Sequence, residues 1–324
     1  MMTRNEPTPP PNAPTPEPDA WGGQSRISAL AEALAPVLLG VCGLITVLTT
    51  VGILLVLAVQ SLEFFVKSGV GIGDFLFGTV LKPEASPPRF GILPLVWGTF
   101  LVAFGASCIA LPIGLMSAIY LSEYAPRSVR GVLKPTLELL AGVPTIVYGY
   151  LALLLVTPVL KAILEPLGLR VEQFNALSAC VVVGVMIVPL VSSLSEDVLS
   201  AVPAGLREAA YGLGATKFEV STRIVLPAGL SGVVASFILA ISRAVGETMA
   251  VVLAAGMMPQ ITLNPLTSVE TMTTYIVQVI GGEASYGSPK YLSLFAVGLA
   301  LFGITLTLNV LSSLVLRRYR EVYQ

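Results

Sequence analysis

The sequence predicts an all-α integral membrane protein with six transmembrane helices. Hydrophobic residues make up 55 % of the chain and charged residues only 11 %, against about 25 % charged residues in soluble domains. The hydrophobic residues gather in runs, and a run of about 20 apolar residues is long enough to cross a bilayer as a helix. We expect six such spans, at residues 35–59, 92–121, 139–160, 174–194, 229–256 and 291–316.

The N-terminal segment differs in composition from the rest of the chain. Seven of the 24 prolines lie between Pro7 and Pro18, and such Pro-rich sequence with few apolar residues predicts a disordered cytoplasmic tail at residues 1–34. A Pro-rich docking segment is the alternative. Residues 35–59 should form an uncleaved first transmembrane helix, because this run is of spanning length and does not follow directly on a short basic head. The other five spans form one region, residues 92–316.

The distribution of lysine and arginine predicts the orientation of the spans. Both termini are expected in the cytoplasm, because positive residues favour cytoplasmic loops. With this orientation, eleven of the 18 Lys and Arg residues lie in cytoplasmic segments, six lie outside and one lies within a span. We therefore expect a multi-pass protein of the cytoplasmic (inner) membrane with long outer loops at residues 60–91 and 257–290. A short helix around residues 275–280 is expected at the outer face.

Prolines in the second, third and fourth spans predict broken or kinked helices there. They are Pro112, Pro144, Pro158 and Pro189. The run Leu140–Gly149 around Pro144 has two interpretations. Freed backbone groups and the hydroxyls of Thr145 and Tyr148 could line a polar pathway, or the small residues of the run could allow close helix packing.

Composition excludes several classes of function. A net charge of −1 and a pI near 5.6 offer no basic surface for nucleic acid. The chain has no histidine, so it lacks the usual general base at neutral pH and histidine metal sites. Cys42, Cys108 and Cys180 are far apart within apolar runs, which indicates core residues rather than a metal site or a disulfide. We expect no catalytic and no metal-binding residues.

A polar segment at residues 200–227 separates the fourth and fifth spans. Pro203 suits the first turn of a helix, and the spacing that follows predicts a short amphipathic helix ending at Gly212 and Gly214. Its expected apolar face is Leu206, Ala209, Ala210 and Leu213, and its polar side is Arg207, Glu208 and Tyr211. Thr216 and Glu219 have the spacing of a capping box that begins a second helix. This unit favours docking into a groove of another protein; a helix lying on the lipid surface is the alternative.

The fifth span carries the only clearly buried ionisable residues that we expect within the spans, Arg243 and Glu247. They are four residues apart in the expected helix, so they share one face and can pair. An arginine within the bilayer costs about 2.5–3.5 kcal/mol even on insertion scales, which makes such residues candidates for a transport pathway. A guanidinium is also a planar, bidentate donor for an oxyanion. The alternative is a structural salt bridge.

The loop resembles the coupling-loop signature of binding-protein-dependent ABC importer permeases. The matching residues are Glu208, Ala209, Ala210, Gly214, Ile224, Leu226 and Pro227, and both their types and their spacing agree with the signature. In that family the loop sits in a cleft of a cytoplasmic ATPase and transmits its movements. The resemblance therefore implies ATPase coupling for these residues and a type I ABC importer permease fold for the chain.

Two further runs, Leu140–Gly149 and Ser242–Val251, resemble the phosphate-specific importer permeases, and the long outer segment before the last span resembles their PstC-type subunit. The resemblance extends from about residue 92 to the C-terminus. It implies translocation of inorganic phosphate, with Arg243 and Glu247 in the substrate pathway. The implied partners are a second homologous permease subunit, an ATPase dimer that binds ATP and Mg, and an extracytoplasmic phosphate-binding protein, besides membrane lipid.

The chain has no phosphate-binding glycine loop. ATP hydrolysis is therefore expected in a partner, so the chain is not an enzyme by itself and needs no cofactor of its own. Three alternatives remain. The oxyanion could be sulfate or molybdate. A secondary transporter or channel, independent of an ATPase, would use an intramembrane charge pair but would not need the Glu208 signature. A membrane scaffold would explain the docking helix but not Arg243.

Overall fold

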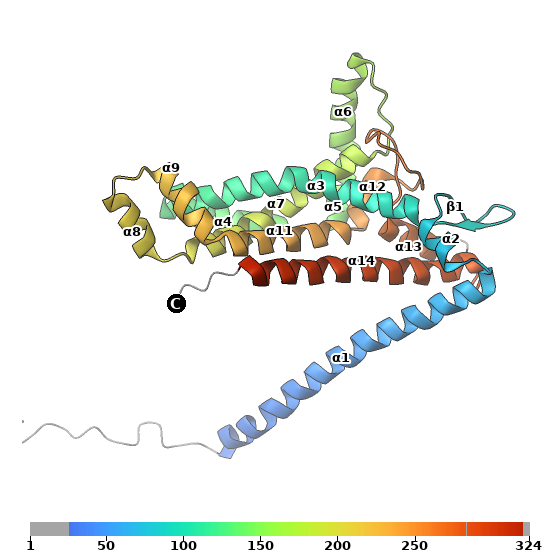
Figure 1. Cartoon of the computed structure of the whole chain (residues 1–324), viewed down its shortest axis with the longest axis horizontal. Coiled ribbons are helices and arrows are strands. Elements are labelled where there is room, and N and C mark those ends of the chain that lie inside the picture. Colours follow the sequence, from blue (N-terminus) through green and yellow to red (C-terminus); the bar gives the residue numbers. More distant parts are fainter. Residues whose placement is uncertain (1–25, 283, 320–324) are drawn as a thin grey trace, which may run out of the picture. The chain divides into compact units, whose positions relative to one another are not determined.

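The computed structural model describes residues 26–282 and 284–319, and most of this part is helical (Figure 1). The chain divides into two compact units, Met1–Val56 and Leu57–Gln324. The described residues of the first unit belong to helix α1 (Arg26–Ser68), whose last turns belong to the second unit. Because α1 begins at Arg26, the expectation of disorder is wrong for residues 26–34. The remainder of the expected tail lies outside the described residues.

The expected number of spans is confirmed in the described part of the chain if one bent pair of helices counts as one span. Five spans are single: Leu34–Ser68, Leu93–Tyr124, Thr145–Leu167, Ala176–Ser200 and Pro289–Leu311. The remaining span, fifth in chain order, consists of Lys217–Ala228 and Leu230–Val245, which meet at 72°. The third span begins at Thr145 rather than at residue 139, because the residues before it form a separate helix.

Several spans are built from more than one element. The second is α3 (Leu93–Ile119) with the π-helical turn η1 (Tyr120–Tyr124). The third is α5 (Thr145–Leu151), the π-helical turn η2 (Ala152–Val156), α6 (Thr157–Leu164) and the 3-10 turn η3 (Glu165–Leu167). The fourth is α7 (Ala176–Ser200), and the last lies in α14 (Pro289–Tyr319). In the fifth, α9 (Lys217–Glu219), η4 (Val220–Val225) and α10 (Leu226–Ala228) lead into α11 (Leu230–Val245).

The prolines of the spans differ in their effects. Pro112 and Pro189 lie inside α3 and α7, and neither helix is broken there. A break does occur before the third span, because α4 (Arg127–Ala141) ends at Gly142 and Pro144 precedes α5. Pro158 lies in the first turn of α6, directly after the π-helical turn η2. Among these four prolines, therefore, those that coincide with an irregularity in the helix are the two that follow a glycine or a π-helical turn.

Close helix packing explains the glycine of the run around Pro144. A Cβ atom at Gly149 would lie 3.0 Å from the Cα and carbonyl oxygen of Ala250 in α12 (Met249–Ala255), so the two backbones could not approach as they do with a larger residue. Tyr148 is buried, and its hydroxyl donates to the carbonyl oxygen of Leu140 at 2.9 Å. This hydroxyl is thus already used within the chain, and close packing describes the run better than a polar pathway.

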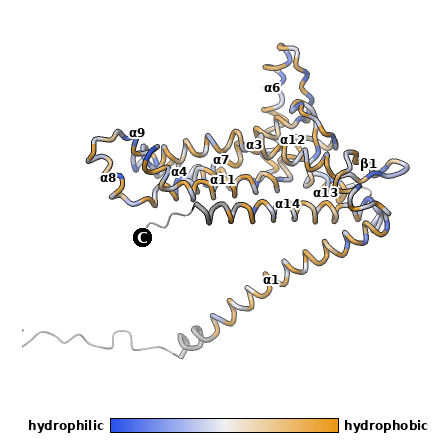
Figure 2. Tube along the Cα trace, in the orientation of Figure 1, coloured by the Kyte–Doolittle hydropathy of each residue, from blue (hydrophilic) through white to orange (hydrophobic). Residues whose placement is uncertain are grey.

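The two ends of the second unit carry different elements (Figure 1). At one end lie α2 (Ile72–Phe77), α13 (Met272–Gly281) and an antiparallel pair of short strands, β1 (Leu81–Lys82) and β2 (Arg89–Phe90). They share an apolar cluster that includes Phe64 and Tyr275. α13 confirms the expected short helix. At the other end lie α8 (Ala204–Gly212) and α9. Figure 2 shows hydrophilic residues gathered at both ends and hydrophobic residues along the helices between them.

Helices α3 and α7 form the centre of this unit. Their contact is made by small and β-branched side chains that are all buried: Val102, Ala103, Ala106 and Ala110 from α3, and Ala179, Val183, Ile187 and Val191 from α7. A Cβ atom at Gly184 of α7 would lie 3.0 Å from Cβ of Ile109, so the glycine allows the two helices to lie close together. The loop at residues 200–227 and helix α11 of the fifth span pack against this pair.

Candidate functional site

The loop with the coupling signature folds as a helix, a glycine turn and a second helix, as the sequence predicts. Pro203 precedes α8, and Gly214 follows that helix with φ of +84°, a left-handed conformation that glycine adopts without strain. The hydroxyl of Thr216 accepts a hydrogen bond from the Glu219 N–H, and the Glu219 carboxylate accepts one from the Thr216 N–H. The expected capping box is therefore confirmed.

The signature residues divide into two groups by their burial. Ala210 is buried, and Ile224 and Leu226 pack with it in an apolar cluster that also contains residues of α3 and α7. Glu208, Ala209, Gly214 and Pro227 are exposed. The first group attaches the loop to the transmembrane helices. The second group is presented to the outside of the chain.

The expected faces of α8 need correction. Leu213 was placed on the inner, apolar face, but its side chain is 90 % exposed, and Ala209 is also exposed. Arg207 was placed on the outer side, but it is half-buried. The helix is rotated from its sequence pattern because the Arg207 guanidinium finds acceptors inside the molecule. Leu213, Phe218 and Tyr211 are large side chains that the loop exposes, and they are called its tip below.

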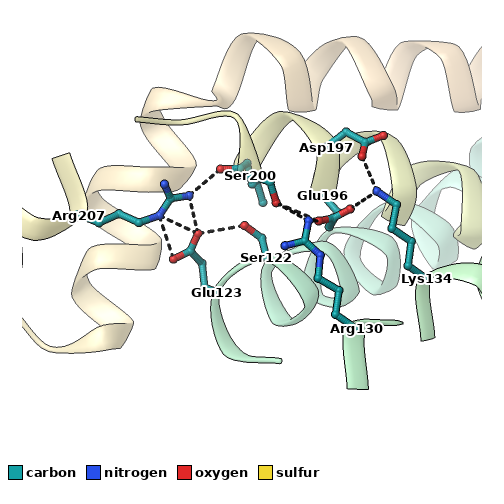
Figure 3. Close-up of polar contacts among 9 residues, drawn as sticks. Ser122, Glu123, Arg130, Lys134, Glu196, Asp197, Ser200 and Arg207 are labelled. Carbon is teal, nitrogen blue, oxygen red and sulfur yellow. Dashed lines mark hydrogen bonds and ion pairs between the residues drawn. The ribbon is translucent and has the colours of Figure 1, made fainter. Parts of the chain in front are cut away.

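Arg207 is held by η1 and by the end of α7 with the residues that follow it (Figure 3). Its Nη2 donates to Glu123 Oε1 at 2.9 Å, and its Nε lies 3.2 Å and 3.3 Å from the two oxygens of the same carboxylate. Its Nη1 and Nη2 donate to the carbonyl oxygens of Val202 at 2.5 Å and Leu199 at 2.8 Å. The Glu123 side chain is only 5 % exposed. One guanidinium therefore joins α8 to η1 and to the end of α7.

A second cluster of charges lies beside the first (Figure 3). Glu196 of α7 is fully buried, and its carboxylate accepts from Arg130 and, at 2.6 Å, from Lys134, both on α4. Lys134 also contacts Asp197 at 2.5 Å, and the Ser200 hydroxyl donates to Glu196 at 2.9 Å. No residue of α4 is buried, so these ion pairs are a main attachment of α4 to α7.

Lys134 stays charged under physiological conditions. Hydrogen bonds to Asp197 and then to Glu196 raise the pKa of its amino group above the ordinary value, because they favour the charged form. The stability that these contacts contribute is complete below the ordinary pKa of lysine. It is lost only as the pH rises through the raised pKa. Loss of the charge on Lys134 is therefore not a switch near neutral pH.

The structure separates Arg243 and Glu247 by a break in the fifth span. Arg243 lies in the last turn of α11, which ends at Val245, and α12 begins only at Met249. Glu247 is 8 % exposed, and its Oε1 accepts from the Ala250 N–H at the start of α12 (3.3 Å). The Thr273 hydroxyl donates to its carbonyl oxygen at 2.9 Å. The expectation of one continuous helix over residues 229–256 is therefore wrong.

The expected contact between the two side chains is also not formed. Within the described part of the chain, the Arg243 guanidinium has no ion pair and no hydrogen bond, and the residue is exposed. Gly246 could have predicted the break, since glycine is common where helices end. The buried acid of the spans that sequence reasoning missed is Glu196, which lies just beyond the expected end of the fourth span at residue 194.

Comparison with known proteins agrees with this architecture. The family described as binding-protein-dependent transport system inner membrane component matches residues 110–321. The chain belongs to this permease family. The chain is 33 % identical to the probable ABC transporter permease protein YqgH of Bacillus subtilis over 272 residues, which are 84 % of this chain and 86 % of YqgH. It is 32 % identical to the phosphate transport system permease protein PstC of Mesorhizobium japonicum (82 % and 86 % covered). It is 34 % identical to PstC of Xylella fastidiosa strain Temecula1 (76 % and 79 %).

Solved structures of this permease type share the fold. A bacterial ABC transporter that imports the acidic polysaccharide alginate aligns with a TM-score of 0.62 at 15 % identity, covering 92 % of this chain and all of that chain. The inward-facing MetNI methionine ABC transporter aligns with a TM-score of 0.52 at 17 % identity, covering 71 % and 95 %. These likenesses support the importer permease fold that the coupling signature implied.

No group of three or more Cys, Asp or Glu side chains in the described residues is arranged to hold a metal. The charged features described above are the loop with its ion pairs and hydrogen bonds and the exposed guanidinium of Arg243 at the helix break.

Gly214 gives a test of the loop conformation. We expect Gly214→Ala to reduce stimulation of the partner ATPase and Gly214→Trp to abolish it, although both proteins insert normally. No atom lies within 4 Å of a Cβ at this position, so the effect comes from the left-handed conformation, which costs other residues about 1–2 kcal/mol. Gly212→Ala is the matched control, because Gly212 is helical and equally open. Normal ATP-driven uptake by a fully expressed Gly214→Trp protein would contradict this role.

Proposed function

We propose that this chain is the permease subunit of an ATP-driven phosphate importer. The observation that carries the proposal is its similarity, over most of its length, to permeases named for phosphate transport, including PstC of Mesorhizobium japonicum and of Xylella fastidiosa. The helix break at Gly246 adds a chemical reason. Transport sites of membrane proteins are commonly built at interrupted helices, where backbone groups and helix ends are free to face a cargo.

Arg243 is the cation that would meet the oxyanion in the substrate pathway. Its guanidinium is unpaired within the described chain and exposed, so it can offer two parallel N–H groups to phosphate. Such a group is costly against lipid, and it should therefore face protein or a water-filled path. Glu247, four residues further on, keeps a carboxylate near the same break. A nearby negative charge would weaken the capture of an anion, which a transport site must also release.

The cytoplasmic loop is the docking site for the ATPase in this proposal. Its tip exposes Leu213 by 90 % and Phe218 by 69 %, and the signature residue Glu208 of the same loop is also exposed. Large apolar side chains exposed on a polar loop mark a site for another protein. ATP and Mg are bound by that partner, a nucleotide-binding ATPase dimer, so the chain is not an enzyme by itself.

A second homologous permease subunit completes the pathway. It would cover the face of α11 that carries Arg243, which has no partner inside the described chain. An extracytoplasmic phosphate-binding protein would deliver the cargo to the end with α2, α13 and the strands, opposite the cytoplasmic loop (Figure 1). The remaining apolar surfaces would contact lipid in the cytoplasmic membrane.

The experiment that tests the proposal is a comparison of oxyanions in the assembled complex. The permease pair and the ATPase dimer are reconstituted in proteoliposomes, and ATP hydrolysis is measured with binding protein loaded with phosphate, sulfate or molybdate. We expect stimulation with phosphate. Stimulation only by sulfate or molybdate would assign another oxyanion to the same permease. Uptake that persists without the ATPase dimer would instead favour a secondary transporter.

Topology can be tested separately by labelling single cysteines. In a variant without Cys42, Cys108 and Cys180, we expect Ser285→Cys to react with an impermeant thiol reagent added outside and Ser128→Cys to react only from inside. Both serines are exposed, so each replacement is conservative and accessible. The reason for this orientation is the excess of positive residues in the segment with Arg130 and in the coupling loop. Labelling of Ser285→Cys only from inside would reverse the orientation.

A further inference from the structure

The contacts of Arg207 are unusual for a surface loop. The Arg207 guanidinium makes five hydrogen bonds, three to the Glu123 carboxylate of η1 and two to the carbonyl oxygens of Leu199, in α7, and Val202, just after it. Its side chain is only 19 % exposed, and that of Glu123 is 5 % exposed. A pair this well buried with a bidentate geometry is more rigid than an exposed ion pair, whose partners are free to turn into water.

Apolar packing by itself holds α8 only weakly. The helix has nine residues, and Ala210 is its one buried residue. A helix of this length is not stable alone in water, so its position depends on the contacts that it makes. The polar contacts of Arg207 are directional, whereas the methyl group of Ala210 can slide in its contact. Arg207 therefore has more influence on the orientation of α8 than its apolar neighbours.

The other arm of the loop reaches the same turn of the chain. The amino group of Lys217, at the start of α9, lies 5.0 Å from the centre of the Tyr124 ring, one residue after Glu123. Both arms of the loop thus attach to η1, the π-helical end of α3. By contrast, the route along the chain to α11 passes through the 72° bend at Gly229.

We propose that Arg207 is the positioning residue through which movement of the coupling helix α8 passes to α3 and α7. This inference rests on the proposed function, since it assumes an ATPase that moves α8. The guanidinium makes α8, η1 and the end of α7 one rigid body. A force on the exposed tip then shifts α3 and α7 directly, while α11 follows through its bend. Glu208 and Gly214 meet the ATPase in this arrangement, and Arg207 carries the displacement inward.

The test compares variants in the reconstituted complex of permeases, ATPase dimer and binding protein. The readout is the factor by which loaded binding protein stimulates ATP hydrolysis, divided by the amount of assembled complex. We expect Arg207→Gln to lower this factor about fivefold or more, a typical size for coupling between sites. Arg207→Lys keeps the charge but cannot reach Glu123 and both carbonyl oxygens together, so an intermediate loss is expected. Arg127→Gln is the matched control, because Arg127 is exposed at the same end and has no partner within the described residues.

Glu123→Gln keeps the inference testable if the Arg207 variants assemble poorly. The amide has the shape of the carboxylate and still accepts a hydrogen bond, so assembly should be normal and the stimulation factor should fall about twofold. A normal factor per assembled complex in Glu123→Gln and Arg207→Lys would overturn the inference, even if less complex assembled. In that case the contact between Arg207 and Glu123 would only stabilise the fold.

Oxyanion stimulation of the wild-type complex tests the proposed function separately from the role of Arg207. If sulfate or molybdate stimulates it instead of phosphate, the variants are compared with that anion. If no oxyanion stimulates it, the readout becomes the ATP-dependent change in thiol labelling of Phe104→Cys, an exposed position on α3. Loss of this change in Glu123→Gln, but not in Arg127→Gln, supports the inference, and an unaltered change in both overturns it.

Discussion

Replacing Arg243 with glutamine is expected to abolish phosphate uptake while the complex assembles in normal amounts. Arg243 has no partner inside the described chain, so its removal leaves no buried carboxylate unpaired. Its loss removes the bidentate, charge-assisted hydrogen bonds to the anion. Each such bond contributes about 1.5–3 kcal/mol, so uptake should fall about a hundredfold or more. The measurement is uptake of labelled phosphate, normalised to assembled complex in membranes.

Variants of Glu247 distinguish a role of Arg243 and Glu247 in the substrate pathway from a purely structural salt bridge between them. If the two charges existed only to satisfy each other, the double variant Arg243→Gln, Glu247→Gln should transport better than Arg243→Gln. In a pathway the double variant should assemble and still fail to transport. Glu247→Gln alone keeps the guanidinium but removes the negative charge that weakens capture, so we expect residual capture with slower release and not complete loss. Arg243→Lys tests whether the planar, bidentate guanidinium is needed, since lysine keeps the positive charge but carries it on one nitrogen. Near-normal uptake by the double variant would contradict the pathway role.

The second large effect is expected when the cations around Glu196 are removed. Glu196 is fully buried, whereas the side chains of Arg130 and Lys134 are 37 % and 26 % exposed. The double variant Arg130→Gln, Lys134→Gln leaves a buried carboxylate without a cation, which costs about 3–5 kcal/mol. Glu196→Gln leaves two cations that can turn to water or to Asp197, so its effect should be smaller. Thermal unfolding of the purified permease measures both.

A triple variant completes this test. When Glu196→Gln is added to the double variant, no buried charge remains, and stability should recover in part although two more hydrogen-bonding groups have been changed. Recovery would show that the cost comes from the unpaired carboxylate. A triple variant less stable than the double variant would contradict the assignment of these ion pairs as the attachment of α4.

In the loop, the sequence predicted the local structure but not the long-range contacts. The spacing around Pro203, Gly214 and the pair Thr216 and Glu219 predicted the helix, the turn and the capping box, and all three are found. These features depend on hydrogen bonds between residues a few positions apart, so local sequence specifies them. The direction of Arg207 could not be predicted in this way. Its partner Glu123 is 84 positions earlier in the chain, and only the packing of α8 against η1 brings them together.

The helix break between Arg243 and Glu247 was not predicted by the local sequence pattern. Arg243 and Glu247 have the spacing of neighbours on one helix face, and the hydropathy of residues 229–256 is continuous enough for one span. The structure ends α11 at Val245 because Thr273 of α13 and the start of α12 bind the groups around Glu247. Contacts from a segment 26 positions away thus override a local pattern. The ATPase coupling and substrate pathway roles assigned from resemblance stay predictions for the experiments above.

The sequence by itself determined the membrane class, the six spans and the family signature of this protein. Hydropathy and short-range spacing are sufficient for these, because each span must satisfy its own backbone hydrogen bonds in lipid and each cap involves adjacent residues. Only the tertiary structure decided that Arg207 points inward, that Glu196 is buried between Arg130 and Lys134, and that Arg243 is left unpaired within the described chain. The physical reason is that charges are paired by distance in space, and helices far apart in the sequence set those distances when they pack.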